Sequence, residues 1–329
     1  MLLKHGGRLL EAAQKHQIPV SDWLDLSTGI NPNGYLIPKI PDAVWLRLPE
    51  NLDGLIDAAQ HYYQCDSLLA VAGSQAAIQA LPRLRKSSVV GLVAPSYAEH
   101  AHAWQKAGHT IVSLSANDID LHIDQLDCLV LVNPNNPSAC QFSKEQCFAW
   151  LDVLQKKNGW LIVDEAFIDC VPELSLSAYA PLNGLIILRS IGKFFGLAGI
   201  RAGFVLAEAD ILEQLDELLG PWALSNPTRF VTACALQDKQ WQGDMRMQLQ
   251  QDSERLAHLL SDYQLMPTGS TPLFQWVITK NAAEIHGLLA KQAIFTRLFV
   301  QPASLRFGLP ANEAEWTHLT SALQAISPR

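Results

Sequence analysis

The sequence is poor in the features that mark nucleic-acid-binding and membrane-spanning proteins. Lysine and arginine number only 24 among 329 residues and are not clustered, whereas aspartate and glutamate number 32. A nucleic-acid surface needs concentrated positive charge, so the net charge of -8 argues against one. No apolar run is long enough to cross a bilayer. We therefore expect the partner to be a small molecule or a second copy of the chain.

Paired cysteines and a leader peptide are also lacking. The six cysteines are scattered and none forms a C-x-x-C pair, so we interpret them as reduced, buried thiols. The N-terminus lacks the long apolar run and the small-residue cleavage site that a signal peptide requires. Together these two features predict a cytoplasmic protein.

The composition that is present is that of an ordinary globular protein. Hydrophobic residues make up 49% of the chain and charged residues 17%. A chain of 329 residues exceeds what one hydrophobic core usually supports, so two associated lobes are expected. No internal repeat or low-complexity linker is visible, and the boundaries must come from changes in pattern.

Short apolar runs alternate with helical periodicity between about residues 68 and 207. This alternation is typical of βαβ units on a mostly parallel sheet, which predicts a three-layer α/β domain. The clearest helix is predicted at residues 143–157, where Ser143 and Gln146 form a capping box. Strands are predicted at residues 68–71, 89–93, 110–114, 128–132, 160–163, 185–188 and 203–206.

Beyond about residue 210 the pattern changes to longer helices with few strands. Helices are predicted at 211–219, 241–260 and 312–325 and a strand near 274–278, which indicates a smaller α+β domain. The first 40 residues are rich in proline and glycine, so they predict an irregular arm after one short helix. The predicted domains are an arm at 1–40, a large domain at 41–210 and a small domain at 211–329.

One lysine stands in an unusual setting after the predicted strand at residues 185–188. Ser190 precedes Lys193 by three residues, and Arg201 follows it by eight in a glycine-rich loop. A phosphate ester needs hydroxyl and guanidinium donors and close backbone approach. Apolar and cationic neighbours favour the neutral, nucleophilic amine that forms a Schiff base. A lysine in this position is otherwise usually a solvated loop residue.

This segment resembles the S-x-x-K…R motif of the class I and II aminotransferase family, which are fold-type-I enzymes of pyridoxal 5′-phosphate (PLP). The resemblance extends over nearly the whole chain. It implies an aspartate-aminotransferase-like fold, PLP bound covalently to Lys193, and a homodimer. Residues 160–167 resemble the strand-end acidic motif of the family, which implies that Asp164 pairs with the protonated pyridine nitrogen. A carboxylate there keeps the ring cationic and able to accept electrons.

The same resemblance implies further cofactor contacts. Asn136 lies in a segment similar to N-P-x-N-P-T-G and would donate to the 3′-oxygen of PLP. The segment Gly73, Ser74 and Gln75 opens a predicted helix whose free N–H groups would bind the cofactor phosphate. Tyr97 matches the aromatic residue that stacks on the pyridine ring.

Segments near both ends of the chain resemble the branch of this family that decarboxylates L-threonine O-3-phosphate in cobalamin biosynthesis. They include His5, Gly6, Gly7 and residues 24–34, from which Asn31 is carried over as a substrate-binding residue. Histidinol-phosphate aminotransferases generally have tyrosine where this chain has Phe167. That residue favours the decarboxylase branch, with the aminotransferase as the alternative.

Two arginines near the C-terminus complete the predicted substrate site. Arg306 would fork onto the substrate carboxylate, since bidentate geometry suits a planar anion. Arg297 is the candidate for the substrate phosphate, helped by the His5-Gly6-Gly7 segment. Either arginine could instead be an ordinary surface residue. The loop between them is shorter than in the family pattern.

The sequence departs from the family at two further points, and it carries one closely spaced histidine pair. Leu48 replaces the tyrosine that reaches the cofactor phosphate across the dimer interface, and Tyr62 or Tyr63 is a possible substitute. Ser138 and Ala139 replace the Thr-Gly of the asparagine segment. His100 and His102 are spaced two apart on a predicted helix, which makes them a poor metal pair, and no metal is expected.

Three functions remain open from the sequence. Decarboxylation would release CO2 and (R)-1-amino-2-propanol O-2-phosphate, whereas breaking the Cα–H bond in the same pocket would give transamination. A catalytically silent protein that keeps the PLP fold is the third. The complete set of Lys193, Asp164, Asn136 and Arg201 argues against the silent protein.

Overall fold

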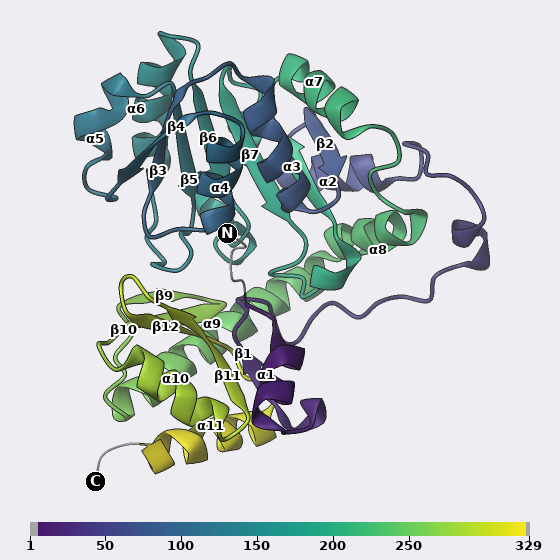
Figure 1. The fold of residues 1–329 in the computed structure, drawn as a ribbon. Helices are drawn as coiled ribbons and strands as arrows, with labels where there is room; N and C mark the ends of the chain where they lie inside the picture. The colour runs from purple at the N-terminus through teal and green to yellow at the C-terminus, as the bar shows by residue number, and fades with distance from the viewer. Residues whose placement is uncertain (1–5, 327–329) are drawn as a thin grey trace. The chain divides into compact units, whose positions relative to one another are not determined.

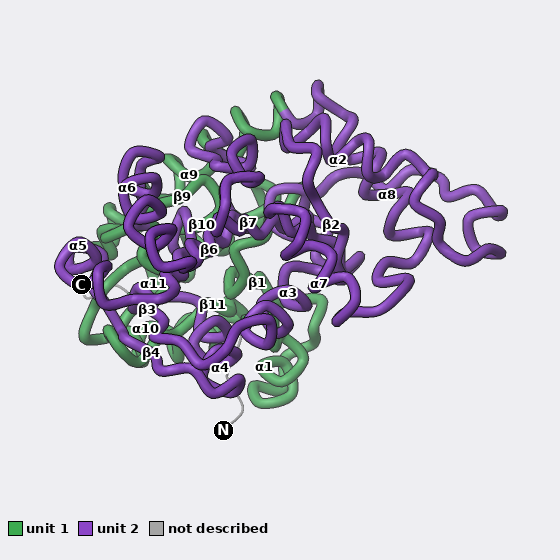
Figure 2. The backbone as a smooth tube through the Cα atoms, turned by 90° about the horizontal axis from the view of Figure 1, so that it is seen from above, with its two compact units in different colours: residues 1–33, 137–139, 243–329 green, residues 34–136, 140–242 purple. Residues whose placement is uncertain are grey.

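The computed structural model describes residues 6–326, and contacts divide the chain into two compact units (Figure 2). The larger unit comprises residues 34–136 and 140–242, and the smaller comprises residues 1–33, 137–139 and 243–329. These breaks near residues 33 and 242 differ from the predicted ones near 40 and 210. Within residues 6–326, the structure contains no helix that is both long and apolar enough to span a membrane.

The larger unit is built on a seven-stranded sheet with the order β2-β8-β7-β6-β5-β3-β4 (Figure 1). The run of strands from β4 to β7 is parallel, and β8 is antiparallel to both of its neighbours. The predicted mostly parallel sheet is thus confirmed. The strands are β2 (Leu68–Val71), β3 (Val89–Val93), β4 (Thr110–Leu114), β5 (Cys128–Val132), β6 (Trp160–Asp164), β7 (Leu185–Ser190) and β8 (Gly203–Leu206).

Helices bury both faces of this sheet. Ile162 and Leu188 pack on one face with Trp104 of α4 and Leu215 of α7. Successive side chains of a strand point to opposite faces, so the alternate positions, such as Leu161, lie on the other face of the sheet. They are equally buried. The helices are α2 (Leu55–Tyr63), α3 (Ser74–Ala80), α4 (Ala98–Lys106), α5 (Ile119–His122), α6 (Lys144–Gln155), α7 (Ala209–Leu219) and α8 (Asn226–Gln237).

The predicted capping box at the start of α6 is present. The Ser143 hydroxyl accepts from the Gln146 N–H at 3.3 Å, and the Gln146 side chain accepts from the Ser143 N–H at 2.9 Å. Two donors that would otherwise lack a partner at a helix start are satisfied in this way.

The smaller unit carries a five-stranded sheet with the order β1-β11-β12-β10-β9. The strands are β1 (Leu24–Leu26), β9 (Gly269–Thr271), β10 (Phe274–Ile278), β11 (Ile294–Phe299) and β12 (Ser304–Gly308). The helices are α1 (Leu9–His16), α10 (Ala282–Ala290), α11 (Glu313–Ile326) and the part of α9 (Lys239–Asp262) that follows residue 242.

The N-terminal arm is not irregular throughout. After α1, residues 24–26 form a strand that pairs in parallel with β11, with Leu24 opposite Ile294. Leu24 and Leu26 are buried, so part of the predicted arm belongs to the core of the smaller unit. A strand of three residues carries almost no periodic signal, and its partner lies near the other end of the chain.

Candidate active site

Asp164 and Ser190 end adjacent parallel strands of the larger unit. Asp164 is the last residue of β6 and lies opposite Leu188 of β7, two positions before Ser190. Because alternate residues of a strand share a face, both side chains lie on the face that α4 covers. Open α/β sheets bind their ligands at the carboxyl ends of the strands, where Asp164 and Ser190 lie.

The Asp164 carboxylate is held at both oxygens. His100 on α4 contacts Oδ2 through Nε2 at 2.9 Å, and the Ala166 N–H donates to Oδ1 at 3.1 Å. Asp164 is 3% exposed and His100 is 2% exposed, so the pair is shielded from water. The sequence prediction considered His100 only as a poor metal ligand and missed this contact.

Position in the chain could have identified His100. It lies one turn after Tyr97, and the two rings meet edge to face with centroids 6.1 Å apart. Helix α4 begins beside Tyr97, the predicted stacking residue. One turn later, the same face of the helix carries His100, which contacts Asp164, the carboxylate predicted to pair with the pyridine nitrogen.

Gly73 and Gly203 allow a close approach of polar groups at the start of α3. A β-carbon on Gly73 would lie 2.8 Å from Arg201 Nη2, and one on Gly203 would lie 2.6 Å from the Ser74 nitrogen. Gly73 has φ of +73°, which favours glycine. The guanidinium of Arg201 thus lies beside the free N–H groups at the start of a helix. This donor set fits the phosphate ester of PLP.

The predicted stacking residue Tyr97 is oriented by a chain of side-chain hydrogen bonds. Its hydroxyl donates to Gln75 Oε1 at 3.0 Å, and Gln75 Nε2 donates to Glu99 at 2.9 Å. The side chain of Gln75 therefore connects the start of α3 to the start of α4. Its backbone N–H remains the part of Gln75 predicted to bind phosphate.

The asparagine segment after β5 is fixed by its first two amides. Asn133 exchanges two hydrogen bonds of 3.0 Å with the Phe142 backbone, and Asn135 donates to the Pro95 carbonyl at 2.8 Å. Asn136, the predicted donor to the cofactor, is half-buried at the end of this rigid segment.

Lys193 is half-buried beside an apolar ring. Its Nζ lies 5.8 Å from the centroid of Phe167, which is itself buried. Phe167 follows Asp164 by three residues, so the strand end that carries the carboxylate also supplies a wall beside the amine. An aromatic face of this kind attracts an ammonium group.

The contacts of Tyr62 and Tyr63 do not support either residue as the substitute for the tyrosine that Leu48 replaces. The Tyr62 hydroxyl donates to Asp169 at 3.0 Å, and the Tyr63 ring packs 4.6 Å from the guanidinium carbon of Arg189. Burial raises the pKa of Tyr63 well above its usual value. Both side chains thus belong to a buried cluster around Arg189, and Leu48 is exposed.

Four predicted substrate residues gather in the smaller unit. Arg306 donates from Nη2 to the Ser27 carbonyl at 2.9 Å, and the Gly7 N–H donates to Ser27 Oγ at 2.9 Å. A β-carbon on Gly6 would lie 2.5 Å from the same Ser27 carbonyl. Arg297 of β11 lies opposite Arg306 of β12. His5 lies outside the described residues.

The charge of Arg306 depends on its surroundings. Burial and the neighbouring Arg297 lower the pKa of Arg306 to about 9, against the opposing effect of Asp25. A bound anion would offset both causes, so this guanidinium is prepared for a negatively charged ligand. Asn31 is buried and accepts from the Asn33 N–H at 2.8 Å, and its contact with substrate stays a prediction.

The sheet order of the larger unit is that of an enzyme of PLP fold type I. A family model described as "Aminotransferase class I and II" matches residues 51–323. The chain is 51% identical over 322 residues to the threonine-phosphate decarboxylase of Pseudomonas aeruginosa, covering 98% of this chain and 97% of that protein. It is 37% identical to the enzyme of the same name from Sinorhizobium sp, with 97% of each chain covered. The chain belongs to the aminotransferase class I and II family.

A solved structure supports the fold. The histidinol-phosphate aminotransferase from Sinorhizobium meliloti in complex with PLP superposes with a TM-score of 0.82 at 19% identity, covering 99% of this chain and 96% of that one. The predicted family, fold and PLP cofactor are confirmed. Because an aminotransferase shares the fold, the fold itself does not separate the two reactions, and the roles of individual residues stay predictions.

Proposed function

We propose that the protein is a PLP-dependent decarboxylase that converts L-threonine O-3-phosphate into CO2 and (R)-1-amino-2-propanol O-2-phosphate, a step of cobalamin biosynthesis. The observation that carries the proposal is the pairing of Arg297 with Arg306 across two antiparallel strands. Residues directly opposite in such a pair share a face of the sheet. Two guanidinium groups side by side suit a substrate with two anionic groups, and threonine phosphate carries a carboxylate and a phosphate.

The larger unit supplies the residues that would hold the cofactor. When bound, PLP supplies a cationic ring that accepts the electron pair left at Cα when CO2 departs. Asp164 keeps the ring nitrogen protonated, and His100 orients Asp164. Ser190, Arg201 and the backbone after Gly73 bind the phosphate group, while Tyr97 stacks on the ring and Asn136 donates to its 3′-oxygen.

Lys193 has two roles in the proposal. Its Nζ would attach the cofactor, and the same nitrogen would hold the proton that Cα receives. The buried ring of Phe167 keeps water from one side of Nζ. Exclusion of water favours proton transfer from a fixed group.

The smaller unit supplies the residues that orient the substrate. Arg306 binds the carboxylate, and Arg297 binds the phosphate with the Gly6 and Gly7 backbone. Orientation decides which bond at Cα breaks, because only a bond perpendicular to the ring gives up its electrons to it. The carboxylate position set by Arg306 would therefore decide between loss of CO2 and loss of a proton.

The test is to incubate the purified protein with PLP and L-threonine O-3-phosphate and to measure CO2. We expect release without any 2-oxo acid and none from Lys193→Ala. Arg297→Gln should raise KM for the phosphorylated substrate more than it changes kcat. Product that appears only when a 2-oxo acid is supplied would instead establish transamination.

We further propose a cytosolic homodimer. Residues 36–52, between β1 and α2 (Figure 1), expose large apolar side chains: Leu36, Ile37, Trp45, Leu46, Leu48 and Leu52. Leu36, Leu46 and Leu52 are between 83% and 97% exposed in the single chain. A patch of this kind usually marks a protein–protein interface. A second copy of the chain is the occupant that family resemblance implies.

A further inference from the structure

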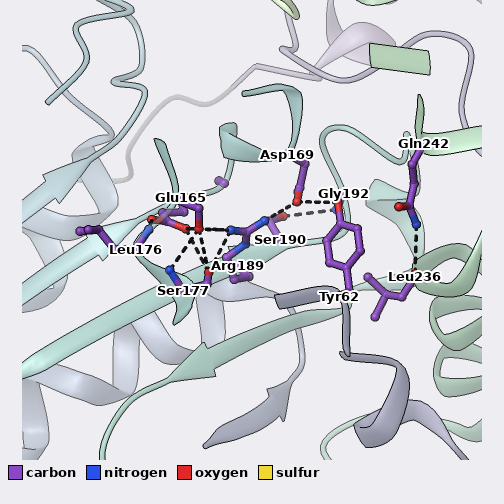
Figure 3. Close-up of polar contacts among 12 residues, drawn as sticks. Tyr62, Glu165, Asp169, Leu176, Ser177, Arg189, Ser190, Gly192, Leu236 and Gln242 are labelled. Atoms are coloured by element: carbon purple, nitrogen blue, oxygen red, sulfur yellow. Dashed lines mark hydrogen bonds and ion pairs between the residues drawn. The ribbon is translucent and has the colours of Figure 1, made fainter. Parts of the chain in front are cut away.

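A buried charge network lies behind the ends of β6 and β7. Arg189 of β7 donates from Nη1 to Glu165 Oε2 at 2.7 Å and from Nη2 to Asp169 (Figure 3). Arg189 is 3% exposed, and both carboxylates are 0% exposed. One cation and two anions are thus completely removed from water.

Further donors extend the network. Glu165 accepts from the Ser175 hydroxyl at 2.6 Å and from the Leu176 N–H at 2.7 Å. Asp169 accepts from the Tyr62 hydroxyl of α2 at 3.0 Å. Although burial alone would lower the pKa of Arg189, the adjacent Asp169 and Glu165 raise it above its usual value. The guanidinium is therefore a permanent cation. It connects β7 with the segments that carry Glu165, Asp169 and Ser175.

Each charged member is a close sequence neighbour of a predicted cofactor residue or of the Phe167 wall. Glu165 follows Asp164 directly, and Arg189 directly precedes Ser190. Successive side chains of a strand point to opposite faces, so Arg189 lies behind the strand that presents Ser190. Asp169 follows Phe167, the wall beside Lys193, by two residues.

The contact between Tyr62 and the lysine loop extends the network. The Tyr62 ring lies 5.8 Å from the ring of Phe195, two residues after Lys193. The hydroxyl of Tyr62 binds Asp169 at the same time. The segment that carries Lys193 is thus connected at both of its ends to the charges around Arg189.

Stability does not explain why the network is charged. Desolvation of ions can exceed their attraction, and replacing a buried ion group by apolar residues is often neutral or stabilising. Here two carboxylates share one guanidinium, so a net negative charge remains. What an arginine between two carboxylates does provide is a fixed, forked geometry that an apolar contact lacks.

We propose that Arg189, Glu165 and Asp169 are positioning residues that hold Asp164 and the Ser190–Lys193 segment at the separation PLP requires. Arg189 fixes the end of β7 against the end of β6, and Asp169 fixes the Phe167 wall. The inference rests on the proposed roles of Asp164 and Lys193 toward PLP.

Three variants test the inference. For each we measure the affinity of the apoprotein for PLP, the pH midpoint of the absorbance change of bound PLP, and the free energy of unfolding in urea. Arg189→Met leaves two buried carboxylates without their cation. Arg189→Lys keeps the charge but cannot fork to both. The triple variant Glu165→Gln, Asp169→Asn, Arg189→Met removes every charge, so it should regain wild-type stability.

We expect Arg189→Met to weaken PLP binding roughly 10- to 100-fold and to move the absorbance midpoint, with Arg189→Lys between it and the wild type. The triple variant should unfold like the wild type and still show the weaker binding and the moved midpoint. A triple variant with wild-type affinity and midpoint would overturn the inference, because the network would then be structural only.

Arg229→Met is the matched control, since Arg229 of α8 is a second buried arginine with an ion pair in the same unit, to the more exposed Asp53 at 2.5 and 2.8 Å. It should lower stability without moving the midpoint. An equal midpoint change in Arg229→Met would also overturn the inference. If the wild type itself fails to bind PLP, the proposed function fails instead, so the two failures are distinct.

Discussion

His100 Nε2 lies 2.9 Å from Asp164 Oδ2, and both side chains are almost completely buried. This contact places a second residue behind the carboxylate predicted to face the pyridine ring. It restricts rotation of the carboxylate about its last torsion, which is broad when no partner is present. The orientation of Asp164 is therefore fixed before any cofactor arrives.

Removing His100 should weaken both folding and cofactor binding. His100→Ala leaves Asp164 Oδ2 buried without this partner, so we expect a loss of about 1–3 kcal/mol in the free energy of unfolding. PLP affinity should fall as well, whereas His100→Gln should recover part of both. Urea unfolding and PLP titration measure the two effects. Unchanged PLP affinity in His100→Ala would show that the contact does not orient Asp164.

The lowered pKa of Arg306 predicts a pH limit on substrate binding. The pKa of about 9 in the folded protein lies below the usual 12.5. Burying the cation therefore lowers the free energy of unfolding below pH 9, and this cost is relieved as pH rises through 9. The charged form binds anions, so affinity for L-threonine O-3-phosphate should fall above about pH 9. Titrations with Lys193→Ala, which does not turn over, measure this limit.

Arg297→Gln provides the control for that limit. The positive charge of Arg297 is one cause of the lowered pKa of Arg306, so its removal should shift the fall in affinity to higher pH. Because the substrate amine titrates identically with both proteins, the difference between them reports Arg306. A fall at the same pH in both proteins would rule out this coupling.

Ala139 should be a site where glycine stabilises the protein. Its φ is +60°, in the left-handed region, where the family pattern has glycine. An L-residue there costs roughly 1–2 kcal/mol, partly offset by about 0.5–1 kcal/mol of extra chain entropy for glycine. Ala139→Gly should therefore raise the free energy of unfolding by up to about 1 kcal/mol. Ala139→Val, with a branched β-carbon, should lower it, and the reverse order would refute the argument.

The exposed segment at residues 36–52 predicts the oligomeric state. Wild-type protein should elute and scatter light as a dimer of the 36.3 kDa chain. Charged substitutions at Trp45 and Leu46 should shift it toward monomer, because burying an unpaired charge at an interface is costly. Substitution of Leu121, an exposed leucine on α5, is the control and should leave the dimer intact. A monomeric wild type would exclude the proposal.

The larger sheet was predictable because its strands are continuous apolar runs bounded by turns. The strand at residues 128–132, for example, begins and ends at the predicted residues. Because it is buried on both faces, each of its positions is apolar. Strand β1 was not predictable, because three residues provide no period and their partner is distant.

The predicted site was only partly complete. Asp164 and Ser190 end strands and Lys193 closely follows one, where spacing along the chain predicts position. His100 and Arg189 were missed because their partners lie on other elements, and only packing of α4 on the sheet or register between β6 and β7 brings them together. Contacts of this kind depend on tertiary structure, and the one local signal for His100 was its position one turn after Tyr97.

The most direct test of the account is to reduce the PLP-loaded protein with borohydride, digest it and locate the bound cofactor by mass spectrometry. The account predicts a phosphopyridoxyl group on Lys193 and no labelled peptide from Lys193→Ala. A group on another lysine, or none in the wild type, would contradict it.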